Sequence, residues 1–183
     1  MNTGASVSTL LKKMRLFFYV VIFNILVSPI AQSEENPKLT FTPYEPQKVI
    51  FDFYFDRPEK INSALYWIRS LITPLMDSPY NYAPEFMDII VMIHGTEVVA
   101  LTKQNNKKYK SAVDRIGYYE AIGVKFKVCS IAAKDFGYVD ADFYDFVEIV
   151  PSAMTELVHW QMKGYGVITP QIYDKKLSNE EIR

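Results

Sequence analysis

Cysteine is almost absent from this sequence of 183 residues, which contains only Cys129. A single cysteine excludes a disulfide within the chain, so its thiol is buried and inert, free and reactive, or bonded to another chain. Histidine is nearly as scarce, with His94 and His159 alone. Because these three side chains lack the close spacing of metal ligands, we predict no metal site.

Two motifs of common enzyme classes are also missing. The sequence has no glycine-rich phosphate loop, since Gly164-Tyr165-Gly166 does not lie between a strand and a helix. Gly-x-Ser-x-Gly, the main hydrolase signature, does not occur either. We therefore expect no cofactor.

Positive charge is in slight deficit, with 20 basic and 21 acidic side chains. Three of the basic residues fall in the first 33 positions, which contain no acid, so the remainder has 17 against 21, a net charge of −4. The one local basic cluster, Lys107, Lys108 and Lys110, follows a helical pattern and is read as a solvated face. Nucleic-acid partners need clustered positive charge, so we expect none here.

The first 33 residues have the three parts of a secretory signal peptide. Lys12, Lys13 and Arg15 are basic, an apolar run covers residues 16–27, and Ala31-Gln32-Ser33 fits a small-x-small cleavage site. A membrane anchor is the alternative, but a spanning helix needs about 20 apolar residues. This run is shorter and is interrupted by Asn24. We expect export to the periplasm with cleavage, which leaves no stable membrane anchor.

The rest of the chain divides into three parts. Residues 34–47 are polar and rich in proline, which predicts an extended lead-in. Residues 48–173 form one domain large enough to bury a core. Residues 174–183 are charged and are expected to be a polar tail.

Apolar strand patterns alternate with helical patterns through the domain. Strands are predicted at 49–55, 87–93, 124–128, 146–150 and 165–169. A helix is predicted to begin at Pro58 and to be followed by a loop that contains Pro74, Pro79 and Pro84. Further helices are expected at 97–102, from about 109 to Gly123, at 130–136 and at 152–164. This alternation predicts an α/β domain of three layers, α/β/α, with a mostly parallel five-stranded sheet.

Polar residues follow three of these strands at their carboxyl ends, where open parallel sheets bind ligands. His94-Gly95 follows the second strand, Cys129-Ser130 the third and Pro151-Ser152 the fourth. We predict His94, Gly95, Ser130 and Ser152 as ligand-binding residues. The order of the strands does not follow from the sequence, so the meeting of His94 with Cys129 stays an expectation.

Cys129 lies between a strand and the start of a helix, where unpaired N–H groups favour a thiolate. A thiolate there is a nucleophile that can hold a sulfur atom as a persulfide, so Cys129 is our candidate catalytic residue. The alternative is a small buried hydrophobe, which is common for free cysteine. Of the remaining polar residues, Asp52 is either a buried, hydrogen-bonded acid or an outward-facing one, and Glu97 is expected to be an ordinary first-turn acid.

Several segments resemble the DsrE-like family, and best its single-chain, YchN-like branch. They are Val91-Met-Ile-His-Gly95, Val124-Lys-Phe-Lys-Val-Cys-Ser-Ile-Ala-Ala133 and Val147-Glu-Ile-Val-Pro-Ser152, with Glu156-Leu157, Gln161, Gly164-Tyr165 and Pro170 after them. The resemblance covers the chain from Lys48 to Pro170. It implies a Rossmann-like fold and a homo-oligomer, a trimer or hexamer.

The same resemblance implies a role in sulfur metabolism. Some family members carry sulfur as a persulfide on a cysteine in a Cys-x-x-Ala-Ala segment, which Cys129-Ser-Ile-Ala-Ala133 matches. Partners would be sulfur donor and acceptor proteins or small sulfur species. The chain departs from the well-understood carriers in its export signal and in Lys134-Asp135-Phe136, where relay members have basic residues.

Two functions therefore stand side by side. The first is a periplasmic protein that carries sulfur on Cys129, at most a sulfur carrier or sulfurtransferase-like protein. The second is a non-catalytic oligomer that binds a small ligand or a partner and keeps Cys129 as a buried structural residue.

Overall fold

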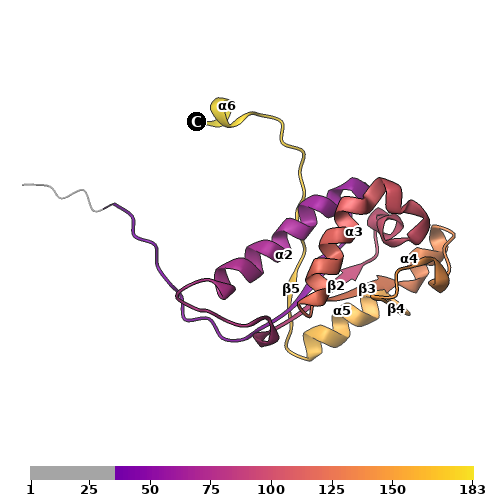
Figure 1. Cartoon of the computed structure of the whole chain (residues 1–183), viewed down its shortest axis with the longest axis horizontal. Coiled ribbons are helices and arrows are strands. Elements are labelled where there is room, and N and C mark those ends of the chain that lie inside the picture. The colour runs from indigo at the N-terminus through magenta and orange to yellow at the C-terminus, as the bar shows by residue number, and fades with distance from the viewer. Residues whose placement is uncertain (1–35) are drawn as a thin grey trace, which may run out of the picture. The chain divides into compact units, whose positions relative to one another are not determined.

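A computed structural model describes residues 36–183 (Figure 1). The predicted signal peptide, residues 1–33, lies outside the described residues. Residues 36–46 form neither helix nor strand, and the hydroxyl of Tyr80 donates to the carbonyl of Thr42 at 2.6 Å. Within the described part, no helix is long and apolar enough to cross a membrane.

The domain is built on a sheet of five parallel strands in the order β4-β3-β2-β1-β5. The strands are β1 (Gln47–Phe53), β2 (Met87–Ile93), β3 (Lys125–Cys129), β4 (Val147–Val150) and β5 (Gly166–Ile168). Strands β1 and β2, which both lie inside the sheet, are mostly buried, as expected of a parallel sheet covered on both faces. The predicted three-layer α/β/α fold with a five-stranded parallel sheet is confirmed.

Side chains alternate between the two faces of the sheet and separate two apolar clusters. The larger cluster contains Phe51, Phe53, Val91 and Phe126 and packs against α2 (Ile61–Met76) and α3 (Asn106–Ala121). The smaller one contains Ile50, Ile90, Met92 and Cys129 from the strands and Ala153 and Leu157 from α5 (Ala153–Met162). Figure 1 shows α2 and α3 on one side of the strands and α5 on the other. We call the side covered by α5 the α5 face.

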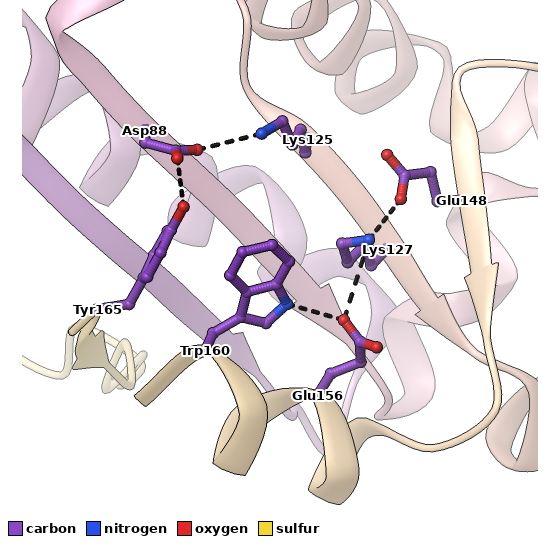
Figure 2. A network of polar contacts seen from close by, with 7 residues as sticks. All are labelled: Asp88, Lys125, Lys127, Glu148, Glu156, Trp160 and Tyr165. Carbon is purple, nitrogen blue, oxygen red and sulfur yellow. Dashed lines mark hydrogen bonds and ion pairs between the residues drawn. The ribbon is translucent and has the colours of Figure 1, made fainter. Parts of the chain in front are cut away.

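A polar network also ties α5 to its face of the sheet (Figure 2). The ammonium group of Lys127 pairs with Glu148 of β4 and lies 3.9 Å from Glu156 of α5. Trp160 Nε1 donates to the same Glu156 carboxylate at 2.8 Å. Since the Lys127 side chain is only 9% exposed, this is a nearly buried charge with two acidic partners.

Two details of the predicted elements differ. Pro74 lies inside α2 instead of in the following loop, because a proline near the end of a helix disturbs only the last turns. The predicted helix at 97–102 is a 3-10 segment, Thr96–Leu101. The other helices are α4 (Ser130–Asp135) and the short α6 (Asn179–Ile182), which lies within the predicted polar tail.

Candidate functional site

A cavity of about 630 Å³ opens at the carboxyl edge of the sheet. Three strands run from β1 towards β4 on one side, and β5 lies on the other side of β1. The connections therefore diverge at β1, which is where open α/β sheets bind ligands. The cavity is lined by residues that follow β1, β2 and β5 and by α4, among them Tyr54, His94, Gly95, Ala132, Phe136 and Thr169.

His94 is the centre of a polar cluster beside this cavity. Its Nε2 lies 2.7 Å from Oδ1 of Asp52, and both side chains are largely buried, at 12% and 19% exposed. The ring also stacks on Tyr54, with 5.0 Å between centroids and 19° between planes. Thr169, just after β5, donates to the other Asp52 oxygen at 3.4 Å. The carboxylate therefore fixes the orientation of the imidazole, as it does in many catalytic sites.

The loops that carry this cluster are held together by Glu97. The Glu97 side chain is fully buried, and its two oxygens accept the backbone N–H groups of Gly95 at 2.8 Å and Phe55 at 3.0 Å. Thr96 adds two bonds to the carbonyl of Phe55, from its N–H and its hydroxyl. The expectation that Glu97 is an ordinary first-turn acid is wrong, because its carboxylate joins the ends of β1 and β2.

Replacement of Glu97 by glutamine should lower the free energy of unfolding by about 2 kcal/mol near pH 4, since the amide NH₂ would face a backbone donor. Burial raises the pKa of the Glu97 carboxyl above its ordinary value. The Glu97 carboxyl therefore stabilises the wild-type protein fully below the pKa that it has in the unfolded chain. This contribution to the free energy of unfolding is lost as the pH rises through the pKa that the carboxyl has in the folded protein. The glutamine does not titrate, so the difference between wild type and variant should narrow towards neutral pH.

Urea unfolding of both proteins at about pH 4 and about pH 7 measures this difference. A difference that widens as the pH rises would contradict the argument. It would mean that the two N–H donors stabilise the Glu97 carboxylate more than burial destabilises it.

Cys129 ends β3 on the same face of the sheet as His94. Met92 pairs with Lys127 and Ile93 with Val128, and the N–H of His94 still donates to the carbonyl of Phe53 at 3.1 Å. Continuing this register by one residue places His94 opposite Cys129, roughly 5 Å apart at Cα. The ring of His94 leans towards β1, and no hydrogen bond joins it to Cys129 among the described residues.

The thiol itself is enclosed. Cys129 is 5% exposed and belongs to the apolar cluster beneath α5. Ser130 is half-buried at the start of α4, and the carbonyl of Ser152 accepts bonds from the first turn of α5. Of the predicted site residues, His94 and Gly95 line the cavity, whereas Cys129, Ser130 and Ser152 are not part of its lining.

The sequence analysis did not assign Asp52, Tyr54, Glu97 or Thr169 to the site. Asp52 could have been assigned from the sequence, because a charged residue in an apolar strand needs a polar partner when it is buried. Among residues 36–183, no group of three His, Cys, Asp or Glu side chains is arranged to hold a metal ion. What the geometry defines is an open, doubly wound α/β domain with an acid–imidazole pair at the edge of its sheet.

Comparison with known proteins identifies the family. The sequence model of the DsrE/DsrF-like family matches residues 48–170, so the chain belongs to this family and the predicted resemblance is confirmed. No curated protein matches the chain. The fold is similar to that of MTH1491 from Methanobacterium thermoautotrophicum, at 22% identity over 68% of this chain and 99% of that one, with a TM-score of 0.54.

Two further structures are more distant. The ychN protein from E. coli is 17% identical over 67% of this chain and 98% of its own, with a TM-score of 0.48. BT1422 from Bacteroides thetaiotaomicron is 14% identical over 68% of this chain and 95% of its own, with a TM-score of 0.46.

Proposed function

We propose that this DsrE-like protein takes part in sulfur metabolism by carrying sulfur as a persulfide on Cys129. The observation that supports this most is the position of the thiol. Cys129 ends its strand at the carboxyl edge of the sheet, one strand from His94 and on the same face. Family membership, which is associated with sulfur metabolism, supports the sulfur-related part of the proposal.

The chemistry needs a donor with a sulfur–sulfur bond, such as a polysulfide. The Cys129 thiol loses its proton to a base, and the thiolate attacks the outer sulfur of the donor. A new S–S bond forms at Cys129 while the donor S–S bond breaks, and the shortened polysulfide leaves with the electron pair. No external oxidant or reductant takes part, since the donor supplies the oxidised sulfur.

The proposal includes the setting in which this happens. The signal-like first 33 residues support export to the periplasm. A homo-oligomer, a trimer or hexamer, is supported by exposed apolar side chains on α5, where Met154, Val158 and Met162 are each more than half exposed.

Incubation with polysulfide followed by intact-protein mass spectrometry tests the proposal. We expect an added mass of one or more sulfur atoms on the wild type and none on Cys129→Ser. Ser130→Ala is the matched control, because it changes the adjacent residue and keeps the thiol, and it should retain the adduct. If the wild type acquires no sulfur, Cys129 is not a sulfur carrier.

A specific observation favours a second function, that of a non-catalytic ligand-binding protein. Cys129 is 5% exposed among apolar neighbours, which is the environment of a structural cysteine. A thiol reagent such as Ellman's reagent separates the two functions. Reaction of the native protein supports the carrier, whereas reaction only after unfolding supports the binding protein.

A further inference from the structure

The cavity beside His94 is chemically distinct from the niche of Cys129. Seven of its fifteen lining residues have polar or charged side chains, and the others include aromatic and aliphatic ones. A volume of about 630 Å³ suits a small molecule.

The charges at the cavity disfavour an anion. Asp52, Asp56 and Asp135 all contribute to the cavity or to its His94 cluster. Lys60 is the one ammonium group in the lining, and it is already paired with Asp56 at 2.7 Å. An anionic ligand would therefore meet the carboxylate of Asp135, close to the His94–Asp52 pair, without a free cation in the lining to offset these charges.

The imidazole of His94 offers a hydrogen-bond acceptor to this cavity. In the neutral ring, the bond from Nε2 to the Asp52 carboxylate places the proton on Nε2 and leaves the lone pair on Nδ1. Within residues 36–183, Nδ1 has no hydrogen-bond partner, and His94 lines the cavity. A ligand that donates a proton or a hydrogen bond would complete the site.

We infer that this cavity binds a small neutral thiol, whose S–H group donates to Nδ1 of His94 while Asp52 holds the ring. The aromatic walls formed by Tyr54 and Phe136 suit a polarisable sulfur atom. The inference rests on the proposed function, because the bound thiol would be the partner of this protein as a sulfur carrier. Deprotonation of the bound thiol would move its proton to Nδ1 and give an imidazolium stabilised by Asp52.

His94 can be followed by NMR because the sequence contains few histidines. The chain has two histidines, and His159 is exposed on α5, so it serves as an internal reference. In protein labelled with ¹⁵N-histidine, NMR should show His94 in the Nε2–H tautomer. Titration with N-acetylcysteine methyl ester, a neutral thiol, should shift the Nδ1 signal of His94 and leave His159 unchanged.

Two matched probes isolate the chemistry of the ligand. N-acetylcysteine adds a carboxylate, and N-acetylserine methyl ester replaces the sulfur by oxygen. We expect N-acetylcysteine to bind about tenfold more weakly than the neutral thiol, because its carboxylate meets Asp135. We expect N-acetylserine methyl ester to bind up to about tenfold more weakly, because its oxygen lacks the contact that sulfur makes with the aromatic walls, although its hydroxyl is the stronger donor. In Asp135→Asn, the difference in affinity between N-acetylcysteine methyl ester and N-acetylcysteine should be smaller. Asp52→Asn should weaken the binding of N-acetylcysteine methyl ester about tenfold and change the Nε2 signal of His94.

All titrations are repeated in Cys129→Ser, which cannot form mixed disulfides with the probes. Binding at His94 should persist there, although the sulfur adduct is lost, so this inference and the carrier function fail independently. The inference would be overturned by an unshifted His94 signal or by no binding of N-acetylcysteine methyl ester. It would also be overturned if either N-acetylcysteine or N-acetylserine methyl ester bound as tightly as N-acetylcysteine methyl ester.

Discussion

Gly95→Ala is expected to lower the free energy of unfolding by about 3 kcal/mol, the largest effect we predict for a single methyl group. A Cβ at this position would lie 2.5 Å from the backbone nitrogen of Phe55 and 2.9 Å from its carbonyl oxygen. It would also lie 2.6 Å from Oε2 of Glu97. Glycine is needed here for space and not for its conformation, because its φ of −100° is open to any residue.

Neither neighbour can move away at low cost. The Phe55 backbone is held by Thr96 and Glu97, and the Glu97 carboxylate is fixed by two N–H donors. The methyl group would therefore separate the ends of β1 and β2 and displace His94 from Asp52. Loss of the His94 signal of the Nε2–H tautomer should accompany the loss of stability.

Gly117→Ala is the matched control. Gly117 lies inside α3, and a Cβ there meets no atom within 4 Å. The same substitution should stabilise the protein by about 0.5–1 kcal/mol, because alanine favours a helix over glycine. Urea unfolding of the two variants compares them directly. Equal stability of the two would show that the loop at Gly95 yields easily.

The fold could be predicted because its signals are local. The apolar run at 87–93 marks β2 to the residue, and the spacing from Ile61 to Leu75 marks one face of α2. Strand order could not be predicted, because the placement of β5 beside β1 depends on contacts between residues far apart in the sequence.

The site was predicted only in part for the same reason. His94 and Gly95 stand out as polar residues after a strand, but Asp52, which binds His94, lies 42 residues away on β1. Thr169, which binds Asp52, lies 117 residues from it, after β5. Glu97 seemed ordinary because its neighbours in sequence do not reveal that its carboxylate is buried against Phe55. Cys129 was a prominent candidate because it is the only cysteine in the sequence. Its enclosure by α5 could not be predicted, because it is a property of tertiary packing.

Access to the Cys129 thiol therefore depends on how firmly α5 is held. Leu157 and Ala153 of α5 cover the cluster that contains the thiol. The network of Lys127, Glu148, Glu156 and Trp160 anchors the same helix two residues from Cys129 along β3 (Figure 2). Any change that weakens this anchor should expose the thiol as well as lower stability.

Lys127→Met should lower the free energy of unfolding by about 3 kcal/mol, because it removes a nearly buried cation and leaves two carboxylates without it. Methionine keeps the unbranched apolar stem, so the decrease in stability comes from removal of the charge more than from a change in packing. The ammonium group also lies 5.8 Å from the centre of the Trp160 ring, a contact that methionine loses. Reaction of the native thiol with Ellman's reagent should become faster in this variant, as α5 loosens.

Lys125→Met is the control, since Lys125 lies on the same strand and face but pairs with Asp88 at the surface. Lys125→Met should lower the free energy of unfolding by about 0.5 kcal/mol and leave the rate at which the Cys129 thiol reacts with Ellman's reagent unchanged. Adding Glu156→Gln to Lys127→Met should recover part of the stability, because the amide oxygen can still accept from Trp160 without a buried charge. If Lys127→Met and Lys125→Met prove equally mild, the network does not anchor α5, and the enclosure of Cys129 rests on apolar packing alone.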